Sequence, residues 1–162
     1  PPPPPPPRFS SRRRHTRCNR WSRGLGDVYK RQALDEAVQY TNERVQMGRP
    51  IAQFQMIKGM IADMAVKVES SRALLYKAVN MLIEEHPGVE RFSSMAKIAC
   101  CDAAMDVATD AVQLHGGYGY LKEYPVERMF RDAKITQIYD GSNQVMRQIV
   151  ADQLNKAQAA KL

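Results

Sequence analysis

The chain has 162 residues, 44% of them hydrophobic and 25% charged, and a formal net charge of +7. This length is enough for one domain with a sizeable core, and the apolar runs are too short to span a bilayer. Of the three cysteines, Cys100 and Cys101 are adjacent, which indicates neither a disulfide framework nor a zinc site and favours the reducing cytoplasm.

The positive charge is concentrated at the start of the chain. Residues 1–32 hold nine of the 24 Lys and Arg residues and a single acidic residue, Asp27, whereas residues 33–162 hold 15 basic and 16 acidic residues. A native arginine-rich arm of this kind would bind RNA or DNA, which is the competing interpretation of the segment. The rest of the chain has no charge excess that would indicate a nucleic-acid partner.

Residues 1–32 have the features of sequence foreign to the native protein. They begin with seven prolines, lack helical or strand periodicity, and have the Pro and Arg content of a disordered chain. The stretch "DVYKRQ", Asp27 to Gln32, back-translates to a sequence that resembles the transposon end used in preparing sequencing libraries. We therefore expect a disordered cloning or assembly artefact, and a native protein that extends upstream of Ala33.

From Ala33 onward, apolar residues recur at three- and four-residue steps, which is the period of an amphipathic helix. The first helical segment, residues 33–50, opens without a cap, as expected of a helix cut in mid-run, and Gly48 and Pro50 end it. Its predicted buried face holds Leu34, Ala37, Val38, Thr41 and Val45.

Four more helices are predicted, over about residues 52–85, 89–114, 124–135 and 142–157. Many small residues lie in the apolar stripe of the helix at 89–114, which would let its neighbours approach closely. No alternating strand pattern of useful length appears. The sequence therefore predicts an all-α fold, an antiparallel up-and-down bundle like a four-helix bundle with one short extra helix.

Three positions have ordinary structural interpretations when they are considered alone. Asp140 stands before Gly141 at the start of the last helix, and Asp-Gly-Ser is good capping chemistry, so the residues alone favour an N-cap. The loop "HGGYGY", residues 115–120, favours a turn between helices. Arg44, considered alone, is best interpreted as a helix residue whose side chain is solvated.

Three motifs nevertheless occur together in order: "ERVQMGRPIAQFQ", "QLHGGYGYLKEYPVERMFRDAKI" and "IYDGSNQVMRQIV". Together they resemble the C-terminal helical domain of the FAD-dependent acyl-CoA dehydrogenases, in particular the short- and medium-chain, butyryl-CoA dehydrogenase-like members. The resemblance covers residues 33 to about 157, so residues 33–162 are expected to be this domain with its first helix truncated. It implies a homotetrameric parent enzyme that oxidises acyl-CoA to trans-2-enoyl-CoA and passes electrons to an electron-transfer flavoprotein.

The resemblance also implies a catalytic base. In the family a carboxylate removes the α-proton of the acyl-CoA while the β-hydrogen leaves as hydride to FAD, and the usual base is the glutamate of an "IYEGT" motif. The matching residue here is Asp140, whose side chain is one methylene shorter, so its oxygen lies about 1.5 Å further back. The change is consistent with a substrate that is bulkier or branched near the α-carbon, with a slower enzyme, or with a degenerate member in which Asp140 only caps a helix.

Contacts to FAD follow from the same resemblance. Arg44 would meet the pyrophosphate as a fixed positive charge, and the glycine-rich loop would let the backbone approach the adenosine end, generally that of a neighbouring subunit. Gly141 would let the substrate thioester pass close to the backbone. The implied cofactor-binding residues are Arg44, Gln55, Gln113, Gly116, Gly117, Ser142 and Gln144, and no metal ligand is expected.

Family members carry two further domains that complete the flavin and acyl pockets, so we expect this fragment alone to be inactive and not to retain FAD. One alternative is an enoyl-CoA reductase, which would use the same residues because direction depends on the redox partner. The other is a non-catalytic helical interaction module whose basic arm binds nucleic acid.

Overall fold

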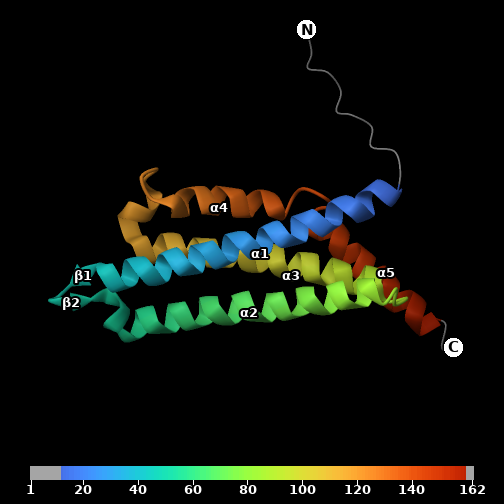
Figure 1. Ribbon diagram of the computed structural model, residues 1–162, viewed down its shortest axis with the longest axis horizontal. Coiled ribbons are helices and arrows are strands. Elements are labelled where there is room, and N and C mark those ends of the chain that lie inside the picture. The colour runs from blue at the N-terminus through green and yellow to red at the C-terminus, as the bar shows by residue number, and fades with distance from the viewer. Residues whose placement is uncertain (1–11, 160–162) are drawn as a thin grey trace, which may run out of the picture.

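The computed structural model describes the backbone of residues 12–159 and the side chains of residues 27–159. Helices dominate these residues, and one small hairpin joins the first two of them (Figure 1). Among the described residues, no helix has the length and apolar content needed to cross a membrane. The elements are α1 (Arg12–Glu43), β1 (Val45–Gln46), β2 (Arg49–Pro50), the 3-10 turn η1 (Ile51–Gln53), α2 (Gln55–Ile83), α3 (Val89–His115), the 3-10 turn η2 (Gly116–Tyr120), α4 (Pro125–Thr136) and α5 (Asn143–Ala159).

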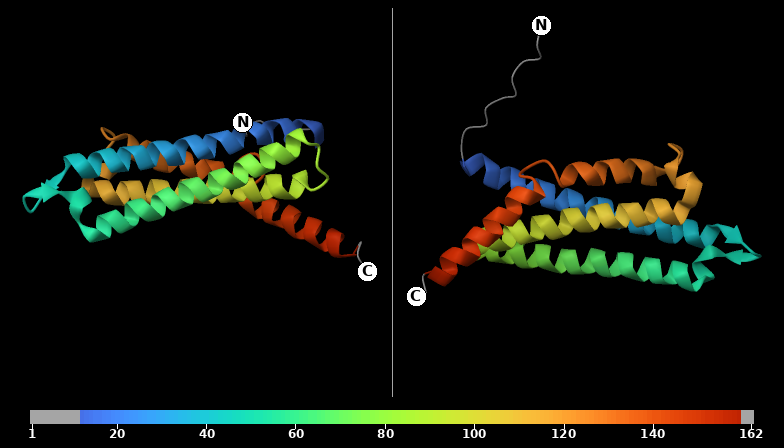
Figure 2. Two further views of the ribbon diagram at one scale, coloured as in Figure 1. Left: turned by 60° about the horizontal axis from the view of Figure 1, so that its bottom comes forward. Right: turned by 180° about the vertical axis from the view of Figure 1, so that it is seen from behind.

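The helices α1 to α4 run up and down beside one another, and α5 leaves the bundle obliquely at the end where α1 begins (Figures 1 and 2). The predicted all-α, antiparallel bundle with a short extra helix is therefore confirmed, with α4 as the short helix. The central element is α3, which contacts each of the other four helices. Its small buried residues allow this close approach: Ala96, Ala103, Ala104, Ala108 and Ala111.

Helix α1 begins at Arg12 and continues without a break through Ala33. The expectation of disorder is therefore wrong for residues 12–32, where Arg, Lys, Leu and Gln favour a helix and proline is absent. The seven prolines lie in residues 1–11, outside the described residues. The origin of residues 1–32 as a cloning artefact stays a prediction.

The predicted buried face of α1 is confirmed in part, since Ala37 and Thr41 are buried and Leu34 packs against the core. Ala33, Ala37 and Thr41 are fully buried, whereas Val38 and Val45, which were expected on this face, are 37% and 55% exposed. The small residues let α1 lie close to the core, and the Thr41 hydroxyl is satisfied by the carbonyl of Ala37 at 2.8 Å. Packing against α3 thus selects the small-residue face over the more apolar one.

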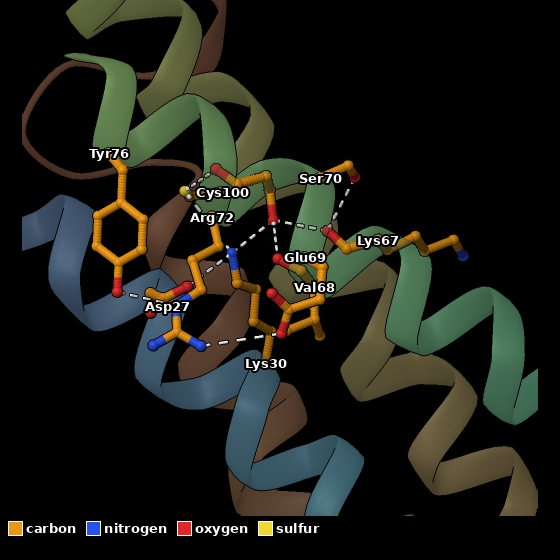
Figure 3. A network of polar contacts seen from close by, with 10 residues as sticks. Asp27, Lys30, Lys67, Val68, Glu69, Ser70, Arg72, Tyr76 and Cys100 are labelled. Atoms are coloured by element: carbon orange, nitrogen blue, oxygen red, sulfur yellow. Dashed lines mark hydrogen bonds and ion pairs between the residues drawn. The ribbon is translucent and has the colours of Figure 1, made fainter.

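Residues 27–32 of α1 pack into the bundle through Lys30, which is fully buried. Its Nζ donates to Ser71 Oγ on α2 at 2.5 Å and to Cys100 Sγ on α3 at 3.8 Å, and it forms an ion pair with Asp27 at 3.0 Å (Figure 3). Burial raises the pKa of the Cys100 thiol to about 11 in spite of the nearby ammonium group. This thiol is therefore protonated at neutral pH and is a poor nucleophile.

Candidate functional site

A pocket of about 400 Å³ opens at the hairpin end of the bundle, where the C-terminal turns of α1 and α3 meet η2. Four of the predicted cofactor-binding residues line it: Arg44, Gln113, Gly116 and Gly117. A fifth, Gln55, is the exposed first residue of α2 and lies outside this lining. The fold therefore brings four of the five predicted residues that precede α4, a first group, around one cavity.

Arg44 supplies positive charge to this pocket. Its guanidinium carbon lies 5.2 Å from the centroid of the Tyr118 ring, within cation–π range. Among residues 27–159, no carboxylate forms an ion pair with Arg44. A half-buried guanidinium that stacks on a ring but has no acidic partner is suited to bind an anion.

The glycines of η2 serve different purposes. Gly116 has a φ of +60° and ends α3, and a Cβ at Gly119 would lie 2.6 Å from the carbonyl oxygen of Val112, so the fold requires glycine at both positions. Gly117 has neither a positive φ nor a neighbour within 4 Å of the place where a Cβ would be. Its missing side chain leaves open space at the pocket, into which a ligand can come close to the backbone.

Aromatic rings that the sequence patterns did not assign to a site stand beside this loop. The rings of Tyr40 and His115 stack with centroids 4.0 Å apart, and Tyr124 meets both of them edge-on. His115 Nδ1 donates to the carbonyl of Ala111 at 2.8 Å, and burial lowers the pKa of the imidazole, which is therefore neutral at pH 7. Tyr40 could have been assigned to the site from the sequence, because it lies one helical turn before Arg44.

The second group of predicted residues lies in the connection between α4 and α5. Asp140 is half-buried there with a φ of +53°, a left-handed conformation that aspartate tolerates better than most residues. The next residue, Gly141, has a φ of +88°, and a Cβ there would overlap Met146 Cε. The backbone is thus held in an uncommon conformation at two successive positions.

The capping role that the sequence alone favoured for Asp140 falls to a different residue. Helix α5 begins at Asn143, so Ser142 occupies the N-cap position. The carbonyl of Ser142 accepts a hydrogen bond from Met146 N–H at 3.0 Å, and its hydroxyl accepts one from Val145 N–H at 3.4 Å. The carboxylate of Asp140 is therefore not needed to cap α5.

The two groups of residues lie at opposite ends of α4 (Figure 1). This helix has 12 residues, which corresponds to a length of about 18 Å. Asp140, Gly141, Ser142 and the exposed Gln144 lie at its C-terminal end, and the pocket around Arg44 lies beyond its N-terminal end. Among the described residues, no group of three or more His, Cys, Asp and Glu side chains could hold a metal ion.

A polar network beneath the α4–α5 connection was also not anticipated. Lys97 of α3 is fully buried and contacts both ends of the connection. Asp102, also on α3, accepts one hydrogen bond from the connection and two from α5. The available signal was a lysine placed among the small residues of the buried stripe of α3. A charged residue at such a position is rarely accidental, because burial disfavours it unless it is paired.

Comparison with known proteins identifies the family. A sequence model described as "Acyl-CoA dehydrogenase, C-terminal domain" matches residues 9–155. The cyclohex-1-ene-1-carbonyl-CoA dehydrogenase of Geobacter metallireducens is 52% identical over 72% of this chain and 31% of its own. A caffeyl-CoA reductase-Etf complex subunit of Acetobacterium woodii is 45% identical over 76% of this chain and 32% of its own.

A solved structure agrees with these relatives. The butyryl-CoA dehydrogenase of Megasphaera elsdenii superposes with a TM-score of 0.81 at 40% identity, covering 86% of this chain and 37% of that one. The chain spans about a third of the length of the curated relatives it matches. Sequence motifs, helical architecture and relatives thus agree, and the chain belongs to the acyl-CoA dehydrogenase family, matching its C-terminal domain.

Proposed function

We propose that the chain supplies part of the catalytic site of an acyl-CoA dehydrogenase that converts acyl-CoA to trans-2-enoyl-CoA, with Asp140 as the base that removes the α-proton. The observation that carries this proposal is the unusual position of Asp140. Asp140 is half-buried and its backbone has a left-handed conformation, while Ser142 occupies the capping position of α5. A conformation of this kind stores strain of about 1–3 kcal/mol and is concentrated at functional sites.

An α-proton beside a thioester is a very weak acid, so its removal requires a carboxylate that is already in place. The fixed α4–α5 connection would hold the Asp140 carboxylate, and the proton would move to one of its two oxygens. When bound, FAD would supply the acceptor for the hydride that leaves the β-carbon. Ser142 and Gln144, beside the base at the start of α5, would help to hold the cofactor there.

The pocket around Arg44 fits a different part of the same cofactor. A guanidinium without an acidic partner suits a pyrophosphate, and the open backbone at Gly117 suits a flat adenosine group. Because α4 separates this pocket from Asp140, we infer that one chain contributes to two flavins, its own and that of a neighbouring subunit. Assembly of the whole protein into a homo-oligomer would bring the Arg44 pocket of one subunit close to the Asp140 connection of another. The family resemblance implies that this oligomer is a tetramer.

For the substrate, we propose an acyl group that is branched or cyclic next to the thioester. The shorter side chain of Asp140 leaves room of about one methylene beside the α-carbon. The relative from Geobacter metallireducens, 52% identical, has a cyclic acyl group in its name. In the full-length enzyme, Asp140→Glu is expected to lower activity on a branched acyl-CoA more than activity on a straight-chain one of equal size, and an equal loss on both would exclude this substrate class.

The reverse reaction is the second candidate, because a relative named as a caffeyl-CoA reductase-Etf complex subunit is 45% identical. The same base would then return a proton to the α-carbon. An electron-transfer flavoprotein is the proposed redox partner in either direction. Reduction and oxidation rates measured with one acyl-CoA pair and one flavoprotein separate the two directions.

The test of the proposed function is Asp140→Asn in the full-length protein, whose gene is recovered by amplification across the junction of Gln32 and Ala33. Asparagine keeps the shape of the side chain and the left-handed backbone but cannot take the proton. Activity is expected to fall by about a hundredfold or more, with the free energy of unfolding unchanged. The matched control is Asp152→Asn, at an exposed position of α5, which is expected to keep full activity.

An Asp140→Asn enzyme that retains activity would contradict the assignment of the base. A variant that loses stability and activity in parallel would indicate a structural role instead. The isolated 162-residue chain is expected neither to retain flavin absorbance after gel filtration nor to turn over acyl-CoA.

A further inference from the structure

A single buried ammonium group connects the two ends of the segment that carries Asp140. Lys97 Nζ, on α3, donates to the carbonyl of Thr136 and to Asn143 Oδ1, each at 2.9 Å. Thr136 is the last residue of α4 and Asn143 is the first residue of α5. The lysine therefore fixes both the start and the end of the connection relative to α3.

Asp102, five positions further along α3, makes a second set of connections. Its Oδ1 accepts from Gln137 Nε2 at 2.7 Å and from Asn143 Nδ2 at 2.6 Å, and its Oδ2 accepts from an Arg147 NH2 group at 2.7 Å. Asn143 thus receives a hydrogen bond from Lys97 and donates one to Asp102. Its backbone N–H also donates to the carbonyl of Gln137 at 3.0 Å, which closes the connection onto itself.

This network is not explained by the packing of the core. Burial lowers the pKa of Lys97, while the nearby carboxylates of Asp140 and Asp102 act in the opposite direction. Replacing an entire buried polar network by apolar side chains of similar volume is often neutral or stabilising, and the surrounding stripe of α3 consists mostly of small residues. Retention of the network calls for a role in fixing one conformation.

We propose that Lys97, together with Asp102, is a positioning residue that holds the α4–α5 connection so that the Asp140 carboxylate stands where it can remove the α-proton. This proposal rests on the proposed function of Asp140. Lys97 is not assigned a contact with the substrate, and it acts through Thr136 and Asn143. Its loss leaves the base present but no longer fixed.

The first test needs no activity and uses the 162-residue chain. In Lys97→Met, the backbone amides of Tyr139 and Asn143 are expected to exchange with solvent at least about tenfold faster than in the parent chain. The matched control is Lys67→Met, because Lys67 also bridges two helices, through Asp106 and Asp110, but does not touch the connection. There the same two amides are expected to exchange within about twofold of the parent rate.

A second variant keeps the test valid if Lys97→Met does not fold. In Lys97→Met/Asn143→Leu an apolar pair replaces the buried polar pair, so no amide oxygen is left without its lysine. The double variant is expected to fold with the fast exchange of Tyr139 retained. Slow exchange in a folded variant that lacks Lys97 would overturn the proposal.

The second test measures turnover by the full-length enzyme. Lys97→Met, or the double variant, is expected to lower kcat by about tenfold or more with little change in KM, since the base is misplaced while substrate contacts remain. Unchanged kcat beside an inactive Asp140→Asn enzyme would overturn the positioning role alone. An active Asp140→Asn enzyme would overturn the proposed function, whereas the exchange result would still decide whether Lys97 fixes the connection.

Discussion

The guanidinium carbon of Arg44 lies 5.2 Å from the centroid of the Tyr118 ring, in the lining of a pocket to which glycine backbone, the stacked pair of Tyr40 and His115 and apolar side chains also contribute. Both partners are planar, so the stack fixes the orientation of the guanidinium without neutralising its charge. The electrostatic character of the pocket therefore depends on one side chain, which makes Arg44 the residue to test first.

Substituting Arg44 by Lys keeps the charge but removes the planar stack and the paired donors. We expect the dissociation constant for FAD of the full-length protein to rise by about tenfold, and that of Arg44→Gln by about a hundredfold, because hydrogen bonds to charged groups contribute about 1.5–3 kcal/mol. Titration followed by flavin fluorescence measures both constants. The control is Arg49→Gln, which stacks on Phe54 outside the pocket. Equal weakening by Arg44→Gln and Arg49→Gln would argue against a specific contact.

His115 gives the domain a predictable response to acid. Its pKa is lowered in the folded chain below the ordinary value of 6.5, since burial disfavours the imidazolium. Between the two values the unfolded chain binds more protons, so the contribution of His115 to stability is complete above pH 6.5 and is lost as the pH falls towards the folded pKa. Urea unfolding from pH 7.5 to 5 should show this loss.

In His115→Gln the slope of stability against pH over that interval is expected to flatten, because the titrating group is gone. A parent chain whose stability does not change below pH 6.5 would rule out a neutral buried imidazole.

Two glycines allow a direct comparison between a position that the fold requires and one that it does not. Gly141→Ala is expected to lower the free energy of unfolding by about 1–3 kcal/mol, since the φ of +88° and the side chain of Met146 both oppose a Cβ. Gly117→Ala should change it by less than about 0.5 kcal/mol, because the added methyl enters open space. Chemical denaturation of both variants measures these differences.

The same pair separates stability from binding. Gly117→Ala in the full-length protein should weaken FAD binding, because the methyl group would occupy the space that we propose for the cofactor. A Gly117→Ala protein with unaltered FAD affinity would show that this part of η2 is not approached by the cofactor.

The two buried lysines are expected to differ in what their removal leaves behind. Replacing Lys30 by Met leaves the buried Oδ1 of Asp27 without its partner, although the rest of the Asp27 side chain is partly exposed and Ser71 Oγ keeps its hydrogen bond to the Lys67 carbonyl. The free energy of unfolding should therefore fall by about 1–3 kcal/mol, because one carboxylate oxygen is left unpaired. Replacing Lys97 by Met leaves buried acceptors at Thr136 and Asn143, and a loss of about 3–5 kcal/mol is expected.

Thermal or urea unfolding of the two single variants under the same conditions tests this difference. Comparable losses in both would mean that Lys30 is as well integrated as Lys97, which would weigh against a foreign origin of the segment that contains it.

Hydrophobic periodicity was sufficient to predict the helices, because long helices joined by short turns repeat their pattern many times. The end of α2 and the start of α3 follow from the "HPG" turn near residue 86, where proline and glycine interrupt the pattern. The first helix ends earlier than the predicted stop at Gly48 and Pro50, at Glu43, because residues 45–50 form a hairpin. The start of α1 was not predictable in the same way. Its arginine-rich segment has no apolar period, and its helix continues upstream from a strongly helical neighbour.

The candidate site was predictable only where motifs carry it. Arg44, the glycine loop and Asp140 could be identified from residue order, because each belongs to a run of characteristic residues. Tyr40 and Lys97 belong to no such run, and their places depend on which helices become neighbours. The exposure of Val38 and the burial of Ala33 have the same cause, since close packing against α3 rather than the hydrophobicity of each residue decides which side chains of α1 are buried.

The distance that α4 sets between Asp140 and Arg44 has a genetic consequence. If each flavin needs Asp140 from one subunit and Arg44 from another, two variants that are inactive at an FAD concentration too low to load Arg44→Gln can complement each other when they assemble together. In mixed oligomers of Asp140→Asn and Arg44→Gln chains, about a quarter of the sites combine two intact halves. Activity should therefore reappear on mixing two dead proteins, whereas a site built within one subunit would give none.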